Sequence, residues 1–281
     1  MTGDEQLSAD LEAIAVEVAT DAAGFVATSR PDFSAVVGKT SATDLVTDVD
    51  QATEARLVAA IRARRPGDSI LGEEGGVHTA RNGRPAADGA VRWVVDPIDG
   101  TVNFVLGLPV YSVSVAARRG DATLAGCVVD VSRGEVFHAR LDGGSWLSVA
   151  GRADVRLSGP RPVRLAEAVV GSGFGYDADV RARQGRVLAD VMGRVGNLRR
   201  LGSAAMDLCY VGAGRLDAYF EAGLNEWDRA AGMLVATEAG ARVATIAGRV
   251  GELTVAAGRQ AYDELEALLR EVGAERVLSA D

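Results

Sequence analysis

WVVDPIDGTVNF, residues 93–104, joins an apolar segment to two aspartates, a proline and a Gly-Thr pair that can begin a helix. Asp96 and Asp99 stand three residues apart at the end of an expected strand. Carboxylates are ligands of hard cations, and the free N–H groups at a helix start bind anions. A cation site beside an anion site indicates phosphoryl chemistry.

A turn is the simpler interpretation of these aspartates, because Asp and Pro are common turn residues. A turn does not explain why two acids directly follow an apolar strand end. A buried carboxylate there needs a cation or several hydrogen-bond donors. We therefore favour a cation site.

Composition restricts the class of protein. The chain has 281 residues, 48% hydrophobic and 25% charged, which suits a single domain with a substantial core. Its net charge of -9 and lack of a long basic run argue against nucleic-acid partners and anionic membranes. Bound cations would still permit an anionic substrate.

The cysteines and the hydrophobic pattern indicate where in the cell the protein is expected. Cys127 and Cys209 show no C-x-x-C spacing, so we expect reduced thiols and a cytoplasmic protein. The acidic N-terminal segment has no signal-peptide pattern, and no apolar run reaches the roughly 18 residues of a membrane span.

Hydrophobic periodicity divides the chain into two subdomains within residues 1–281: about 1–150 is helical and then antiparallel, and 151–281 alternates strands and helices. Helices are expected from about 7 to 18, 50 to 65, 180 to 195, after 203, from 227 to 238 and from 262 to 272. Strands are expected at 69–71, 111–117, 123–131, 135–147 with a hairpin at 142–144, 168–171, 216–220 and 242–245. Residues 78–88 are expected to form a loop.

Other candidate residues have ordinary structural explanations. Glu73 lies in a Gly-flanked pair of glutamates that could be solvent-facing charges, although such a strand end can also approach a ligand. Asp50 follows Thr47 at capping-box spacing, and capping alone would explain it. Asp228 could be a helix cap, with Trp227 a core residue.

Three phosphatase or nucleotide patterns are rejected. The residues between Cys127 and Arg133 lack the glycines of a phosphate-cradling thiol loop. The glycine-rich segment 171–175 is followed by Tyr176, which breaks the dinucleotide fingerprint. Asp48 resembles the nucleophile of haloacid dehalogenase-like phosphatases, but Ala52 stands where Thr or Val is expected.

The combined motifs resemble the inositol monophosphatase family. That family carries W-x-[VI]-D-P-[IL]-D-G-T-x-N-F, matched at 93–104, and a later W-D-x-[AG]-[AG], matched at 227–231. Residues 72–74 and 44–50 match in the same order, so the resemblance covers nearly the whole chain. It implies an α/β fold, an α-β-α-β-α sandwich of the inositol monophosphatase and fructose bisphosphatase type.

The resemblance also implies a function. The protein would be a homodimeric phosphoric monoester hydrolase that uses Mg²⁺, often inhibited by Li⁺, to hydrolyse inositol 1-phosphate with metal-activated water. Two to three Mg²⁺ ions are expected in each site, and the partner is a small phosphorylated polyol. Relatives with this scaffold hydrolyse fructose bisphosphate, histidinol phosphate or adenosine bisphosphate, so these substrates stay open. A non-catalytic sugar-phosphate-binding or regulatory protein is the alternative of another class.

Site residues carry over from the family by motif. The implied metal ligands are Glu73, Asp96, the carbonyl of Ile98, Asp99 and Asp228. The implied catalytic residues, which activate or orient water, are Glu73, Thr101 and Asp50. The implied substrate-binding residues are Gly100, Thr101, Arg199, Gly202, Ser203, Ala204, Glu221 and Asp228. Lys39 falls where the family has a lysine near the metals. The roles of Glu226 and of the two cysteines are not implied, and Arg199-Arg200 together with Glu221 fit inositol phosphate.

Overall fold

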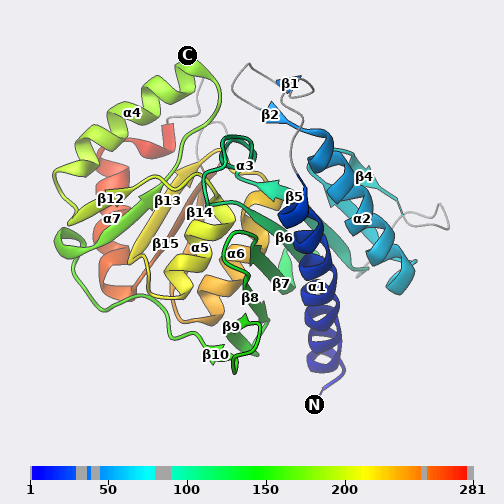
Figure 1. Ribbon diagram of the computed structural model, residues 1–281. Coiled ribbons are helices and arrows are strands. Elements are labelled where there is room, and N and C mark those ends of the chain that lie inside the picture. The colour runs from blue at the N-terminus through cyan, green and yellow to red at the C-terminus, as the bar shows by residue number, and fades with distance from the viewer. Residues whose placement is uncertain (1, 30–36, 39–44, 80–89, 248–251, 277–281) are drawn as a thin grey trace.

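The computed structural model describes residues 2–29, 37–38, 45–79, 90–247 and 252–276. An eight-stranded and a five-stranded sheet face each other in this part of the chain, with helices between them and on both outer faces (Figure 1). The α-helices are α1 (Gly3–Thr28), α2 (Asp48–Arg64), α3 (Thr101–Leu106), α4 (Ala178–Met192), α5 (Ala204–Gly212), α6 (Glu226–Glu238) and α7 (Arg259–Glu271).

The eight-stranded sheet is antiparallel except where β3 pairs with β5. From edge to edge its strands are β10 (Val155–Arg156), β9 (Gly144–Val149), β8 (Glu135–Arg140), β7 (Ala122–Asp130), β6 (Ser112–Arg119), β5 (Arg92–Asp99), β3 (Ser69–Gly72) and β4 (Gly76–His78). A separate antiparallel pair joins β1 (Val37–Gly38) to β2 (Leu45–Val46).

The five-stranded sheet is mixed, with β12, β11 and β13 parallel and the last two pairings antiparallel. Its order is β12 (Asn197–Arg199), β11 (Val169–Ser172), β13 (Ala218–Ala222), β15 (Glu252–Ala257) and β14 (Arg242–Ala247). The carboxyl ends of the parallel strands β11 and β13 therefore lie at the same end of this sheet.

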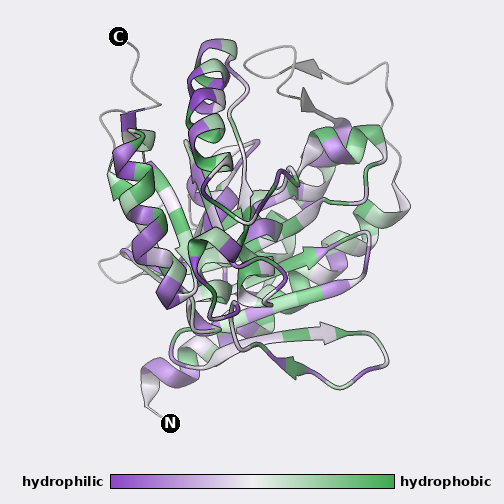
Figure 2. Cartoon of the chain, turned by 90° about the vertical axis from the view of Figure 1, so that its left-hand side faces the viewer, coloured by the Kyte–Doolittle hydropathy of each residue, from purple (hydrophilic) through white to green (hydrophobic). Residues whose placement is uncertain are grey.

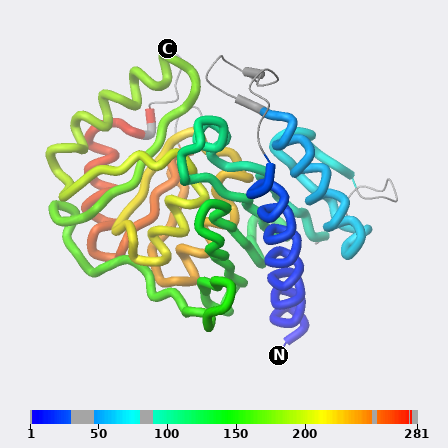
Figure 3. Tube along the Cα trace, viewed as in Figure 1, coloured from blue at the N-terminus to red at the C-terminus, as the bar shows by residue number. Residues whose placement is uncertain are grey.

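Helices α1 and α2 cover the outer face of the eight-stranded sheet (Figure 3). Capping boxes at Thr2 and Thr47 begin both helices by satisfying free N–H groups. Their apolar residues, including Leu11 and Leu57, pack with Trp93 of β5 in one core cluster. Burying each such side chain contributes about 2 kcal/mol.

Helices α5 and α6 form the layer between the sheets, and small residues allow them to approach closely. A Cβ at Gly126 of β7 would lie 2.9 Å from the Cα of Ala231, and one at Gly232 would lie 2.8 Å from the Cβ of Leu208. Helix α6 therefore touches β7 and α5 almost backbone to backbone.

Helices α4 and α7 cover the outer face of the five-stranded sheet in a third core cluster. Hydrophilic and hydrophobic residues alternate along the outer helices (Figure 2), as expected for helices that bury one face. The layers are thus helix, sheet, helix, sheet, helix, and the predicted sandwich is confirmed.

Differences from the sequence expectations are local. The hairpin at Asp142 is present, with φ 59° at that residue and β8 and β9 on either side. Strand β12 was not predicted because it has only three residues. Strand β15 has six residues and was not predicted either, because its pairing depends on β13 and β14, which lie earlier in the chain. Most of the expected loop at 78–88 and Lys39 lie outside the described residues. The strands change sheet between Arg156 and Val169; the subdomain division near residue 150 stays a prediction.

Among the described helices, none is both long and apolar enough to cross a lipid bilayer.

Candidate active site

The two aspartates of the opening motif lie at the irregular end of β5. Asp96 pairs with Ser114 of β6 and Asp99 pairs with Ser112, so three steps on β5 match two on β6. On a regular strand, residues three apart point to opposite faces. The extra residue of this bulge turns both carboxylates to the same face.

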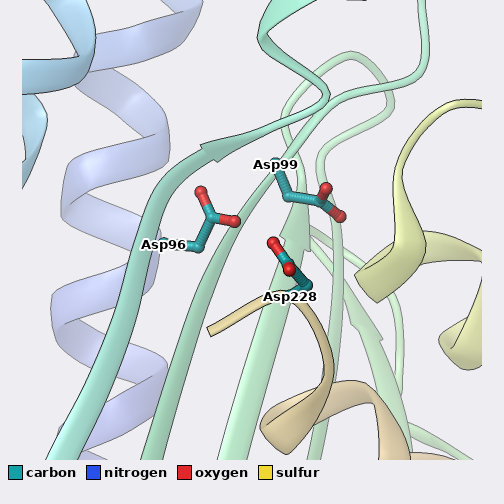
Figure 4. Close-up of side chains that lie close together, drawn as sticks. All are labelled: Asp96, Asp99 and Asp228. Atoms are coloured by element: carbon teal, nitrogen blue, oxygen red, sulfur yellow. The ribbon is translucent and has the colours of Figure 1, made fainter. Parts of the chain in front are cut away.

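Asp228 completes the cluster from a different element. It lies in the first turn of α6, where its Oδ2 accepts a 2.6 Å hydrogen bond from the backbone N–H of Asn225. Carboxylate oxygens of Asp96, Asp99 and Asp228 lie within 4.8 Å of one another. Figure 4 shows the three side chains converging from β5 and α6.

The cluster concentrates negative charge away from water. Burial raises the pKa of Asp96 well above its usual range, and repulsion from Glu73, Asp99 and Asp228 adds to the effect. Burial also raises the pKa of Asp99 to about 6, although Ser203 and Ala205 donate hydrogen bonds to it. The cluster consists of three carboxylates, and their oxygen donors suit a hard divalent cation, which would also offset their mutual repulsion.

Glu73 follows β3, whose parallel pairing with β5 brings the two strand ends together. Its backbone N–H donates to the carbonyl of Val95 at 3.3 Å. Glu54 of α2 holds the turn, because its carboxylate accepts from the N–H groups of Glu74 (2.7 Å) and Gly75 (2.8 Å). The sequence contains no local signal for that role of Glu54.

Asp50 is both a cap and a neighbour of the site. It forms the capping box with Thr47, as its spacing indicated. Its Oδ1 also lies 3.2 Å from the hydroxyl of Thr101, which is 2.9 Å from the carbonyl oxygen of Ile98. Burial raises the pKa of Asp50 to about 6, against hydrogen bonds from Thr47.

A cavity of about 350 Å³ opens beside the acidic cluster. Its lining includes most of the site residues expected from the sequence: Glu73, Asp96, Ile98, Asp99, Gly100, Thr101, Gly202, Ser203, Ala204, Glu221 and Asp228. Asp50 is completely buried behind Thr101 and is not among the lining residues.

Two glycines bring separate loops together at the cavity. Gly100 has φ 92° and Gly202 has φ 94°, conformations that favour glycine. A Cβ at Gly100 would lie 3.1 Å from the carbonyl oxygen of Gly202. Ser203 follows, caps α5 through the N–H of Met206, and donates a 2.6 Å hydrogen bond to Asp99 Oδ2.

Glu221 and Arg200 also line the cavity. Burial raises the pKa of Glu221 to about 7, although Tyr219 donates a 2.6 Å hydrogen bond and Arg200 lies nearby. Gly173 permits this position, because a Cβ there would lie 2.0 Å from Glu221 Oε2. The guanidinium of Arg200 stacks 4.8 Å from the ring centroid of Phe174, which also lines the cavity.

Arg199, the arginine expected at the substrate, lies elsewhere. Its guanidinium bonds the side chain of Asn197 and the carbonyl of Leu198 on the exposed edge strand β12. It is not among the described residues that line the cavity, whereas the adjacent Arg200 is. Successive residues of an extended chain point in opposite directions, and the sequence motif alone could not choose between them.

The structure supports the rejection of the thiol and aspartyl nucleophiles. Cys127 and Cys209 are free and buried, and burial raises both thiol pKa values, which disfavours a nucleophilic thiolate. Asp48 is an exposed residue of the first turn of α2.

The fold and the cluster define a layered α/β protein with an acidic cluster that could hold a metal ion, beside a polar cavity. The inositol monophosphatase family model matches residues 8–277, and the chain belongs to this family. The resemblance inferred from the motifs is therefore confirmed, and the chain is placed among metal-dependent phosphatases of small phosphorylated compounds.

Named relatives cover almost the full length. The chain is 44% identical to the inositol-1-monophosphatase SuhB of Mycobacterium tuberculosis, over 96% of this chain and 97% of that protein. It is 37% identical to the Nus factor SuhB of Vibrio cholerae, over 84% and 85%. Among solved structures, Mycobacterium tuberculosis SuhB superposes with TM-score 0.81 at 42% identity, covering 95% and 98%. The IMPase of Thermotoga maritima gives TM-score 0.80 at 28% identity, covering 95% and 99%.

Proposed function

We propose that this protein is a Mg²⁺-dependent phosphatase that hydrolyses inositol 1-phosphate to myo-inositol and phosphate. The observation that carries the proposal is the convergence of Asp96, Asp99 and Asp228 in a cavity whose lining also includes Glu221 and Arg200. The name of the mycobacterial relatives supports the substrate.

The donor set suits Mg²⁺, which prefers oxygen ligands and keeps several waters. Asp96, Asp99, Asp228 and Glu73 would hold two to three ions, together with the carbonyl of Ile98. Bound Mg²⁺ lowers the pKa of water and neutralises charge that develops on the phosphate and leaving oxygens.

Thr101 and Asp50 would orient the attacking water through the Thr101 hydroxyl. The hydroxyl of Thr101 lies between Asp50 Oδ1 and the carbonyl of Ile98, so donation to either leaves its lone pairs available to orient water. Because Asp50 does not line the cavity, it would act through Thr101. Glu73 lines the cavity and is the candidate general base.

Substrate binding would use several residues of the cavity lining. Backbone N–H groups of Gly100 and Thr101 would hold phosphate oxygens, and the loop Gly202–Ala204 would border the phosphate. Glu221 would accept hydrogen bonds from polyol hydroxyls. The role first assigned to Arg199 passes to Arg200, because only the latter lines the cavity.

Two other readings have support. Fructose bisphosphate, histidinol phosphate and adenosine bisphosphate would use the same acidic cluster with a different leaving group. The relatives named Nus factor favour a second role, a regulatory one through a partner. Retention of every acidic ligand position favours the enzyme over a protein that only binds.

A substrate panel tests the proposal. We expect kcat/KM for inositol 1-phosphate to exceed that for the other three phosphates, with activity lost on chelation by EDTA and restored by Mg²⁺. In Asp99→Asn the amide oxygen can still accept the hydrogen bonds from Ser203 and Ala205, but the charge of one metal ligand is lost. We expect kcat to fall by at least about 100-fold. Full turnover in folded Asp99→Asn protein would refute the metal role.

Lithium inhibition, a homodimer and a cytoplasmic location complete the proposal. The family resemblance supports the first two, and the two free, buried cysteines agree with the third. Adding Li⁺ to the panel and measuring the mass in solution test the first two.

A further inference from the structure

Two arginines stand side by side on the neighbouring strands β5 and β6. Arg92 begins β5 and is the register partner of Arg118 on β6. Like charges directly opposite each other on neighbouring strands destabilise a sheet. Strand β5, which begins with Arg92, contains Asp96 and ends in Asp99.

Glu226 bridges this pair from a third element. Its Oε2 accepts a 2.5 Å hydrogen bond from Arg92 Nη2 and another from Arg118 Nη1. Partial burial opposes ionisation of Glu226, but the two arginines outweigh it and lower its pKa. The carboxylate is therefore charged and joins α6 to both strands.

The position of Glu226 on α6 gives the bridge a consequence for the site. Glu226 is the first residue of the helix, and Asp228 lies in the same first turn. The close contacts at Gly126 and Gly232 hold the body of the helix, beyond that turn. Near Asp228 the first turn is held by the bridge, by a 3.3 Å hydrogen bond from Ser114 to the carbonyl of Trp227, and by an ion pair of Arg229 with Glu252 of β15. The bridge and the Ser114 hydrogen bond tie the turn to β5 and β6, whereas Arg229 ties it to the other sheet.

We propose that Glu226 is a positioning residue, whose ion pairs with Arg92 and Arg118 hold the first turn of α6 so that Asp228 meets Asp96 and Asp99 around a divalent cation. The inference rests on the proposed cation site and extends it to residues outside the cavity lining. Glu226, Arg92 and Arg118 are not among the described residues that line the cavity.

A simple charge effect makes the opposite prediction for the arginines. If Glu226 acted only by adding negative charge near the site, Glu226→Gln would weaken cation binding and Arg118→Gln would strengthen it. If the bridge positions Asp228, both substitutions weaken binding, and the double variant is no worse than either one.

Glu238 provides a matched control on the same helix. It lies at the last residue of α6, where its carboxylate accepts from the N–H groups of Asp142 and Gly144, each at 2.9 Å. Glu238→Gln also removes a charged anchor of α6, but at the end far from Asp228. It should leave cation affinity unchanged.

The experiment titrates Mn²⁺, which takes the same oxygen donors, into the purified full-length chain by calorimetry. We expect the dissociation constant to rise about tenfold in Glu226→Gln and in Arg118→Gln, and to stay within about twofold in Glu238→Gln. The concentration of Mg²⁺ that half-activates the phosphatase should rise in parallel, while kcat recovers at saturating Mg²⁺.

Each outcome decides between explanations. Tighter binding in Arg118→Gln, or unchanged binding in Glu226→Gln, overturns the positioning role. Failure of the unsubstituted protein to bind Mn²⁺ instead refutes the cation site of the proposed function. Circular dichroism and thermal melts establish that each variant is folded; should Glu226→Gln not fold, Arg92→Gln and Arg118→Gln carry the same test.

Discussion

Asp99 is the residue on which most contacts of the site converge. It belongs to the β5 bulge, accepts hydrogen bonds from Ser203 and Ala205 at the start of α5, and faces Asp96 and Asp228. One side chain therefore joins the eight-stranded sheet, the layer of helices between the sheets and the acidic cluster. A substitution here changes both charge and geometry.

The adjacent arginines offer a residue-scale prediction with an internal control. Arg200 lines the cavity, and loss of a charged hydrogen bond to the substrate should raise KM about tenfold in Arg200→Met, with a smaller change in kcat. Arg199→Met removes the same charge one residue away and should stay within about twofold. Steady-state kinetics with inositol 1-phosphate measure both; equal effects would show that only the local charge matters.

At the scale of elements, the position of α6 depends on glycines that let its backbone approach its neighbours closely. Gly126 of β7 faces Ala231, and the backbone at that contact cannot move as a flexible side chain could. The same helix delivers Asp228 to the site from one end and holds the 142–144 hairpin from the other. Its placement therefore links core packing to the geometry of the acidic cluster.

Gly126→Ala tests that link. A Cβ 2.9 Å from the Cα of Ala231 forces α6 away from β7, and we expect a loss of about 1–3 kcal/mol in the free energy of unfolding. Gly185→Ala on α4 meets nothing within 4 Å and should stabilise by about 0.5–1 kcal/mol. Urea unfolding of both variants measures the difference; a neutral Gly126→Ala would show that α6 shifts freely.

At the scale of the whole molecule, the buried acids oppose folding when no cation is bound. The pKa values of Asp50 and Asp99 are raised to about 6. A carboxyl with a raised folded-state pKa contributes stability that is complete below its unfolded pKa and is lost as pH rises through the folded value. Glu12 and Glu226, whose pKa values are lowered, act in the opposite sense only in more acidic solution.

We therefore predict that, in EDTA, the free energy of unfolding falls between about pH 5 and about pH 7.5, by about 1–1.5 kcal/mol for Asp99 alone. Saturating Mg²⁺ should offset the loss, and its stabilising effect should grow with pH because protons no longer compete. Thermal melts at both pH values with and without Mg²⁺ measure this. In Asp99→Asn both the pH dependence and the Mg²⁺ effect should shrink.

Much of the fold could be predicted because its signals are local. The Thr47–Asp50 spacing indicated a capping box, and the Asp142 hairpin followed from its turn residues. Strands β12 and β15 were missed, since a strand of three residues has too few positions to show alternation, and the pairing of β15 depends on β13 and β14. The same limit applied to Glu54 and Glu226, whose partners are far away in sequence.

The sequence by itself determined which chemistry this chain carries. Its oxygen donors, caps and apolar patterns are properties of residue type and short spacing, and they were sufficient to infer the family and the layered fold. Only the tertiary structure decided where those groups point. The bulge that turns Asp96 and Asp99 together, the choice of Arg200 over Arg199, and the bridge of Glu226 to two strands all depend on register and on packing between distant segments. Side-chain direction reverses with a shift of one residue, so local patterns cannot specify it.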